Sequence, residues 1–296
     1  MDLDTPHVSR RRMLLLATAA VSGSVNASAA TEAAHASGDA STLRVASVST
    51  DVEGGLLPAL LESFAAHTKI QTALAYGNDP YGAASKGEAD LVVSHFGHRD
   101  TQRFVTEGLG HWPRTVFSNQ AALIGPPSDP AGVRGTTDLV EAFRRIAAAG
   151  APYVVNDGAG MRYLSQILWH GAGQPPLGAW YLDDGTKAGS AIDRAAQNKA
   201  YFLWGLTPFV REQKANPRAF APLLTADPLL QRLMVAVPVN AARIQGVNAE
   251  AARRLVDYLL SPDVQARILG TAYLGAEQAF WAPAGRHNAG NLLPKS

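Results

Sequence analysis

Apolar and polar residues alternate along the first ordered part of the chain. Residues 43–48 place an apolar side chain at nearly every second position, which predicts a β-strand, and residues 49–55 form a turn-rich stretch. Residues 56–64 have helical spacing, with an early proline whose missing N–H costs little there. The next predicted elements are strand 70–75, helix 83–87 and strand 89–94. This alternation predicts parallel strands joined by crossover helices, and therefore an α/β layer.

A long apolar run at residues 115–126 exceeds one ordinary strand and can pass from one lobe into another. A second α/β rhythm follows, with helices predicted at 137–149, 161–169 and 188–198 and strands at 153–155 and 200–204. A second long strand, 232–239, can carry the chain back, and helices 248–260 and 262–269 complete it. The pattern predicts two lobes joined by two crossing strands, although a single open sheet with extra helices also fits. Lobe 1 is expected to comprise residues 42–120 with 239–296, and lobe 2 residues 121–238.

The N-terminal segment has the pattern of an export signal. Three arginines at residues 10–12 lead directly into an apolar stretch, and Ala27-Ser28-Ala29 offers the small-x-small pattern of a cleavage site. The apolar stretch is interrupted by residues 22–24, so it is too short for a retained membrane anchor. We therefore predict a cleaved signal peptide at 1–29, resembling a twin-arginine signal, with the general secretion route as the alternative. A flexible leader at 30–41 follows, and the mature protein is expected in a periplasm.

Composition removes several classes of function. The 296 residues contain no cysteine, which excludes disulfides, thiolate metal sites, cysteine nucleophiles and a lipidated cysteine. The formal net charge is +1, so the chain has no strongly basic field and nucleic acid is not an expected partner. Hydrophobic residues make up 47% of the chain, enough to build a core.

Specific segments carry a family resemblance. These are Ser49-Thr50 with Gly55-Leu56-Leu57, Gly87-Glu88-Ala89-Asp90-Leu91-Val92-Val93-Ser94-His95, Ile124-Gly125-Pro126-Pro127-Ser128-Asp129-Pro130-Ala131-Gly132, and Val237-Pro238-Val239-Asn240. The chain resembles the substrate-binding proteins of tungstate ABC transporters over nearly all of residues 43–269. The resemblance implies a two-lobed type II periplasmic binding protein with two hinge crossings. It also implies a monomer without a cofactor or catalytic residues, which meets the membrane only through an ABC permease with its ATPase.

The sequence departs from that family in the segment expected to hold the anion. The family has Ser-Arg-Gly-Asp-x-Ser-Gly-Thr-His where this chain has Val155-Asn156-Asp157-Gly158-Ala159-Gly160-Met161-Arg162-Tyr163. The family's arginine is thus replaced by Asn156, and its serine and threonine by Gly160 and Arg162. The hydroxyl groups in the first strand-to-helix turn are retained as Ser49 and Thr50.

The altered segment can still bind an anion. Gly158 and Gly160 precede a predicted helix, whose N-terminus favours negative charge, although two glycines can also form an ordinary tight turn. Arg162 can supply a planar fork for an oxyanion or carboxylate. The predicted ligand-binding residues are Ser49, Thr50, Asn156, Gly158, Gly160 and Arg162, with His95 and Tyr163 as further candidates. The expected ligand is tungstate or molybdate, with a small organic carboxylate as the alternative.

Other chemistries have weaker support. His95, His98 and His111 can form an imidazole metal site, but they lack an acidic partner at helical spacing, and we predict no metal. No Gly-x-Ser-x-Gly elbow and no phosphate-binding loop occur, so the chain is not expected to be an enzyme. Two alternatives stay open: a sensor or accessory protein that binds the same ligand, and a periplasmic hydrolase using His95 or His98.

Overall fold

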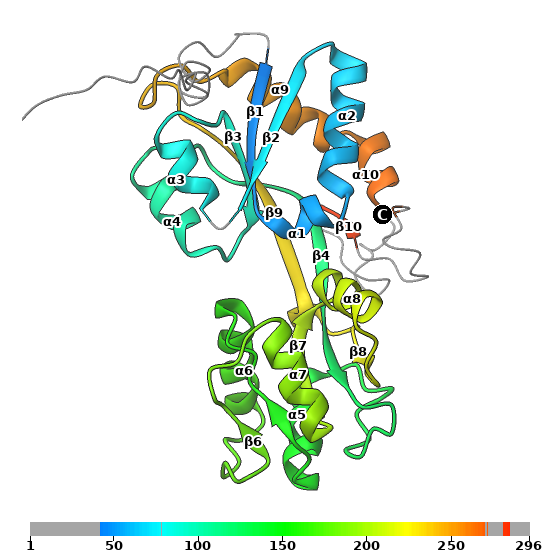
Figure 1. The fold of residues 1–296 in the computed structure, drawn as a ribbon. Coiled ribbons are helices and arrows are strands. Elements are labelled where there is room, and N and C mark those ends of the chain that lie inside the picture. Colours follow the sequence, from blue (N-terminus) through cyan, green and yellow to red (C-terminus); the bar gives the residue numbers. More distant parts are fainter. Residues whose placement is uncertain (1–41, 78, 270, 272–280, 285–296) are drawn as a thin grey trace, which may run out of the picture. The chain divides into compact units, whose positions relative to one another are not determined.

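The computed structural model describes residues 42–269 apart from residue 78, together with residues 271 and 281–284 (Figure 1). The predicted signal peptide and leader lie outside the described residues. The described chain forms two α/β lobes connected by two long strands, β4 (Arg114–Gly125) and β9 (Gln231–Pro238). The predicted two-lobed α/β architecture is therefore confirmed. No described helix is long and apolar enough to cross a membrane.

Lobe 1 is built on the parallel strands β1 (Thr42–Ser47), β2 (Gln71–Tyr76) and β3 (Leu91–His95). β1 pairs with β2 and β3, as the strand–helix alternation predicts, and β9 pairs antiparallel with β3. A short strand, β10 (Trp281–Pro283), pairs with β4. The helices are α1 (Ser49–Glu53), α2 (Leu56–Thr68), α3 (Pro80–Ser85), α4 (Arg99–Thr106), α9 (Ala249–Leu259) and α10 (Pro262–Leu269).

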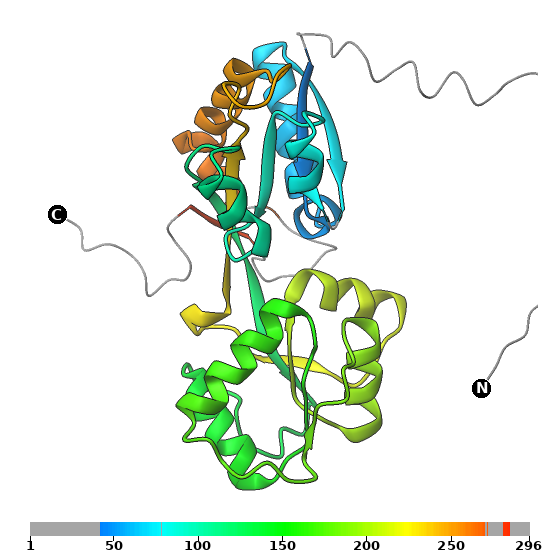
Figure 2. The ribbon, with the colours of Figure 1, turned by 90° about the vertical axis from the view of Figure 1, so that its left-hand side faces the viewer.

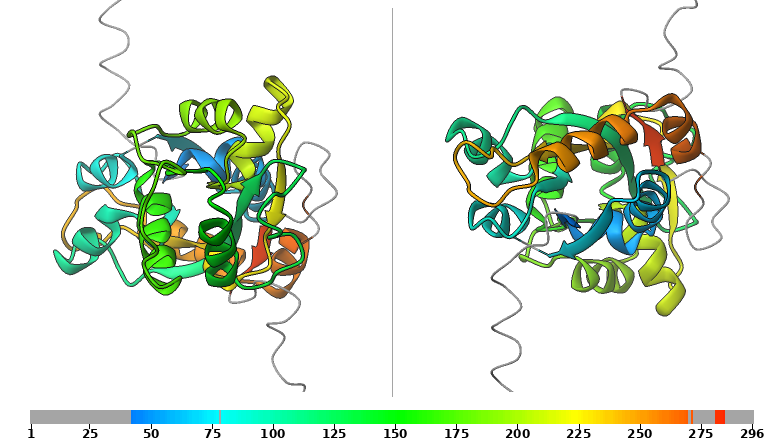
Figure 3. Two further views of the ribbon diagram at one scale, coloured as in Figure 1. Left: turned by 90° about the horizontal axis from the view of Figure 1, so that it is seen from below. Right: turned by 90° about the horizontal axis from the view of Figure 1, so that it is seen from above.

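Lobe 2 surrounds the second half of β4. Its strands are β5 (Tyr153–Val154), β6 (Tyr181–Leu182), β7 (Phe202–Gly205) and β8 (Ala221–Leu224), and its helices are α5 (Leu139–Ala149), α6 (Ala159–Gly171), α7 (Gly189–Asn198) and α8 (Leu206–Ala215), with a 3-10 turn at Pro228–Leu230. β7 and β8 pair antiparallel with β4, and β5 pairs parallel with β6. Figure 3 shows α5 and α6 side by side when viewed from below, in agreement with their contacts.

The two long strands run side by side, as Figure 2 shows, but they differ in the other strands with which they pair. Residues 114–120 of β4 pair with β9, whereas residues 121–125 pair with β7 and β8. β9 pairs with β3 and β4 throughout. The predicted lobe bounds stay a prediction; these pairings favour a first crossing at 120–121 and a return before residue 231.

Three helices differ from the sequence-based prediction. The stretch predicted as a turn at 49–55 contains α1, which ends where Gly54 and Gly55 lead into α2, with Gly55 at φ 76°, a value that suits glycine. α4 and α8 were not predicted. α4 has too few apolar residues for a helical pattern, whereas Leu206, Phe209 and Val210 give α8 a helical spacing that the prediction missed.

One apolar cluster contains residues of both lobes, and a second belongs to lobe 2. In lobe 1, Leu57, Phe64 and Leu255 are fully buried between the helices and the sheet. In lobe 2, Phe143 and Trp169 lie with ring centroids 4.4 Å apart. Burying side chains of this size stabilises the fold by about 2 kcal/mol each. The second cluster matters for the site, because Trp169 belongs to α6 and holds that helix against the lobe.

Candidate functional site

A cavity of about 870 Å³ is lined from both lobes. Its lining comes from the loop after β3, from α6, from the segment before α7 and from the start of β9. The lining residues are His95, Phe96, Gly97, His98, Gly160, Tyr163, Lys187, Gln231, Arg232 and Leu233. The structure thus brings together three of the predicted candidates, namely His95, Gly160 and Tyr163.

The charged groups that line this cavity are cationic. Arg232 and Lys187 contribute cationic groups, and no carboxylate occurs among the lining residues that the structure describes. Opposite charge is attracted more strongly in a partly enclosed site than in bulk water. The cavity therefore favours an anion over a cation or a neutral solute.

Arg232 lies at the start of β9, opposite Asn119 of β4 in the strand register. Within the described part of the chain, its guanidinium has neither a hydrogen-bond partner nor an ion pair. Burial lowers the pKa of Arg232 from its ordinary value, but an arginine stays charged at physiological pH. The group contacts Gly160, because a Cβ atom built on that glycine lies 2.6 Å from an Arg232 Nη atom.

His95 contributes a neutral ring to the same wall. Burial, and then the positive charges of Arg232 and His98, lower the pKa of His95 to about 3. Its Nε2 atom lies 3.4 Å from Nδ2 of Asn119. Two amide oxygens, Oδ1 of Asn119 and Oε1 of Gln231, have no hydrogen-bond partner among the described residues. Polar atoms left without partners mark a place where a partner is missing.

The N-terminus of α6 is held open by Asn156. The Asn156 side chain is buried; its Oδ1 accepts from the N–H groups of Gly158 at 3.3 Å and Ala188 at 3.2 Å. Its Nδ2 donates to the Leu203 carbonyl at 3.2 Å. Ala188 has φ 50°, a strained value for a residue with a Cβ atom, and the bond from Asn156 stabilises it. Asn156 thus positions the turn that carries Gly158 and Gly160, and the segment that carries Lys187.

Arg162 is already paired. It donates to Asp157 and, through two nitrogens, to the carboxylate oxygens of Asp183 at 3.0 and 2.6 Å. Hydrogen bonds to Asp183 and Asp157 raise the pKa of Arg162. Two carboxylates therefore offset its charge, and Arg162 is not among the residues that line the cavity.

Ser49 and Thr50 begin α1, in lobe 1. Both are half-buried, and neither hydroxyl has a hydrogen-bond partner among the described residues. They do not line the 870 Å³ cavity, so the structure does not bring them against Gly160. The next residue, Asp51, is buried, and burial raises its pKa to about 7.

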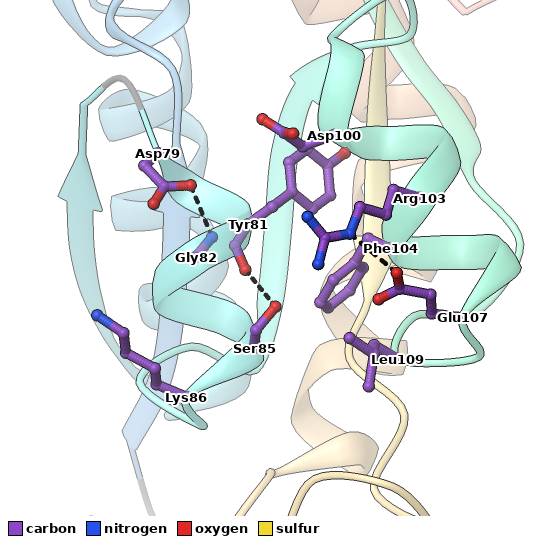
Figure 4. A pocket seen from close by; sticks show the side chains of 10 residues that line it. All are labelled: Asp79, Tyr81, Gly82, Ser85, Lys86, Asp100, Arg103, Phe104, Glu107 and Leu109. Carbon is purple, nitrogen blue, oxygen red and sulfur yellow. Dashed lines mark hydrogen bonds and ion pairs between the residues drawn. The ribbon is translucent and has the colours of Figure 1, made fainter.

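A second cavity, of about 620 Å³, lies between α3 and α4 (Figure 4). Its charged groups are largely paired locally: Arg103 donates to Glu107 at 2.9 Å, and Asp79 accepts from the Gly82 N–H at 2.9 Å. None of the predicted site residues lines it. The cavity beside Arg232 is therefore the better candidate.

The structure also describes the other two histidines of the predicted metal alternative, His98 and the exposed His111. His98 caps α4 by accepting from the Asp100 N–H at 3.3 Å. No group of three or more His, Cys, Asp or Glu residues able to hold a metal ion occurs in the described part of the chain.

Sequence reasoning missed the two cations of the cavity. Arg232 was assigned only to a strand, and its signal is a lone charge at the start of the apolar run 232–239. Lys187 precedes a predicted helix and gives no comparable signal. Only the fold brings the two residues to one wall.

Comparisons with known proteins agree with this architecture. The model of the family described as bacterial extracellular solute-binding protein matches residues 53–271. An ABC transporter anion-binding protein of Haloferax volcanii is 29% identical over 252 residues, covering 82% of this chain and 73% of the relative. The tungstate-binding protein TupA of Peptoclostridium acidaminophilum is 26% identical over 229 residues, covering 76% and 79%. The solved structure of the tungstate-binding protein TupA from Desulfovibrio alaskensis superposes with a TM-score of 0.72 at 25% identity, covering 82% of this chain and 98% of that one.

Proposed function

Because the chain belongs to the family of bacterial extracellular solute-binding proteins, we propose that it is the periplasmic binding protein of an ABC importer and binds a small anion. The names of its relatives, an ABC transporter anion-binding protein and tungstate-binding proteins, support this class of ligand. Transport energy then comes from the ATPase of the partner permease.

The observation that carries the proposal is the charge of the 870 Å³ cavity. It presents Arg232 and Lys187 without a lining carboxylate, and Gly160 of α6 lies in the same wall. The N–H groups of the first helical turn point toward the helix N-terminus, and they favour negative charge there. A small oxyanion or carboxylate matches this set of donors.

Hinge closure is the proposed mechanism. β4 and β9 connect the lobes, and a ligand that contacts both lobes stabilises the closed form by the contacts that the open form lacks. In that closed form Ser49 and Thr50 donate their hydroxyls from lobe 1, while Gly160 donates its backbone N–H group. Gly158 shapes the turn, since its own N–H donates to Asn156. Asn156 and Arg162 hold the α6 turn in place, and Tyr163 and His95 flank the ligand.

Among the possible ligands we favour tungstate or molybdate, because relatives of this chain are tungstate-binding proteins. A small carboxylate is the alternative, since the chain has Asn156 where the resemblance places an arginine. The transporter relatives favour an importer over a sensor. A hydrolase is not favoured, because a histidine with a pKa of about 3 is a weak general base at neutral pH.

Thermal unfolding of the purified protein tests the proposal. The protein is first unfolded and refolded to remove bound solutes, and then heated with tungstate, molybdate, sulfate, phosphate or small mono- and dicarboxylates. A ligand at 100 times its dissociation constant adds about 2.7 kcal/mol, which raises the melting temperature by several degrees. A rise with one of these anions supports the proposal, and no rise with any of them contradicts it.

A further inference from the structure

The charge on Arg232 lacks the compensation that the other buried or half-buried arginines receive. Arg44 pairs with Asp90 at 2.5 Å, and Arg218 pairs with Asp193 at 2.5 Å. Arg232 is partly buried in the cavity wall, yet among the described residues it has no carboxylate and no carbonyl partner. Burying an unpaired charge is costly, so a fold that retains it requires a compensating benefit.

The neighbouring positions leave the guanidinium free to meet a ligand. Gly160 has no side chain, and a Cβ atom there would lie 2.6 and 2.9 Å from the two Nη atoms of Arg232. The ring nitrogen of His95 lies beside Asn119, and the side chain has no carboxylate that could pair with Arg232. Lys187 adds a second cation to the same cavity. Two cations without a lining carboxylate match two negative charges.

We propose that Arg232 is the principal anion-binding side chain of this site, that it acts with Lys187 on a dianion, and that Gly160 is required because the guanidinium occupies the space of a side chain. This inference rests on the proposed function, since it specifies the charge and the anchor of the same ligand. The planar fork of Arg232 donates two parallel N–H groups to two oxygens of one oxyanion or carboxylate. Lys187 acts as a point charge on the remaining oxygens.

A structural role does not explain Arg232. A structural arginine stabilises the fold through partners, and this one has none in the described part of the chain. Its register neighbour Asn119 is 5% exposed and its side-chain oxygen also lacks a partner, so the polar groups around Arg232 are incompletely satisfied without a ligand. The Arg232→Gln variant is therefore expected to melt at the same temperature as the unliganded wild type, or higher.

Calorimetric titration of the full mature protein tests the assignment. The probes are tungstate, molybdate, sulfate and malonate as dianions, and nitrate and acetate as monoanions. For the best dianion, Arg232→Gln is expected to weaken binding about 100-fold and Arg232→Lys about 10-fold, because lysine keeps the charge but loses the fork. Lys187→Gln is expected to weaken it about 10-fold. Arg253→Gln, which removes the same charge from an exposed, paired arginine of α9, is the control and should stay within twofold of the wild type.

A double-mutant cycle tests the space at Gly160. Gly160→Ala is expected to weaken binding about 10-fold by displacing the guanidinium, but to have little further effect in the Arg232→Gln background. Equal losses in both backgrounds would show that Gly160 acts independently of Arg232 and would overturn that part of the proposal.

The outcomes separate this inference from the function on which it rests. If the wild type binds a dianion and Arg232→Gln binds it equally well, the assignment of Arg232 is wrong while the binding function stands. If monoanions bind as tightly as dianions, the assignment of two charges is wrong. If the wild type binds none of the anions, both the proposed function and this inference fail. A fall of several degrees in the melting temperature of unliganded Arg232→Gln would indicate a structural arginine instead.

Discussion

The β1–α1 turn and the β5–α6 turn have the same architecture but different charge. In the first, the hydroxyl of Ser47, at the end of β1, is hydrogen-bonded to the buried carboxyl group of Asp51 in α1. In the second, the neutral amide of Asn156 holds the backbone, and the nearby carboxylate of Asp157 is paired with Arg162. The acids of the two turns therefore differ: Asp51 is buried, which raises its pKa to about 7, whereas Asp157 is paired with an arginine.

The geometry around Ser47 explains the state of Asp51. The Ser47 hydroxyl lies 2.8 and 2.9 Å from the two carboxyl oxygens of Asp51 and 2.9 Å from the Val93 carbonyl. One hydroxyl has one proton, so it donates to Val93 only if Asp51 is protonated and donates to Ser47. This arrangement and the burial of Asp51 both favour the neutral acid.

The largest expected effect is therefore a pH dependence of stability. Burial raises the pKa of Asp51 from 3.8 to about 7, so between these values the folded protein holds a proton that the unfolded chain has released. The stabilisation is complete below about pH 4, falls as the pH rises towards about 7, and is lost above that value, a change of about 4 kcal/mol. Denaturant unfolding across this pH range measures it.

The Asp51→Asn variant isolates this effect. It is expected to remove most of the decline in unfolding free energy between pH 4 and 7, because the amide cannot ionise. Asp263→Asn, at an exposed position on α10, is the matched control and should leave the decline unchanged. If Asp51→Asn kept the full decline, another group would be responsible.

The next largest effect is expected at Asn156. Asn156→Ala removes three hydrogen bonds to backbone groups, and it leaves the half-buried Gly158 N–H and the Ala188 N–H without their side-chain acceptor. We expect a loss of about 2–3 kcal/mol in unfolding free energy, together with weaker anion binding because both the α6 turn and the Lys187 segment lose their anchor. Asn216→Ala, at an exposed position after α8, should change the unfolding free energy by less than about 0.5 kcal/mol. A loss no larger than that of the control would show that the turn does not depend on Asn156.

The fold was largely predictable because its strands have clear signals. The apolar runs at 43–48 and 89–94 became the parallel pair β1 and β3, and the two long runs became β4 and β9, which pair antiparallel with each other. α1 could not be predicted, because its five residues depend on the buried Asp51 and on the glycines that follow, not on apolar spacing.

The site was less predictable than the fold. Local signals led to the prediction of Gly158 and Gly160, since glycines before a helix are visible in one short segment, and of the two Gly160 lines the cavity. The partners of Arg162 could not be seen, because Asp183 is 21 residues further along the chain. Arg232 was missed for the same reason: 72 residues separate it from Gly160, and only the pairing of β9 with β4 and the position of α6 bring them together. A contact between residues so far apart in the sequence produces no periodic pattern of apolar and polar residues from which it could be predicted.

Smaller effects are expected for the hydroxyls of the first turn. Ser49→Ala and Thr50→Ala should each weaken anion binding by about 1 kcal/mol, the contribution of one hydrogen bond, if hinge closure brings them to the ligand. Thr72→Ala on β2 is a control that removes a hydroxyl elsewhere in lobe 1. Calorimetric titration measures all three, and an affinity unchanged by both Ser49→Ala and Thr50→Ala would place the lobe 1 contacts elsewhere.

The smallest effect on anion affinity is expected at Arg162, and it tests whether the paired arginine of the second turn contacts the ligand. If the aspartates keep its guanidinium, Arg162→Gln removes a charge that is already offset and should weaken anion binding only about threefold. If hinge closure instead transfers Arg162 from Asp183 to the ligand, the same variant should lose far more affinity. Asp183→Asn distinguishes the two cases: it should raise the affinity if the aspartate competes with the ligand for Arg162, and leave it nearly unchanged if Arg162 only fixes the turn. A rise in affinity with Asp183→Asn would thus show that Arg162 binds the anion and does not only position the helix.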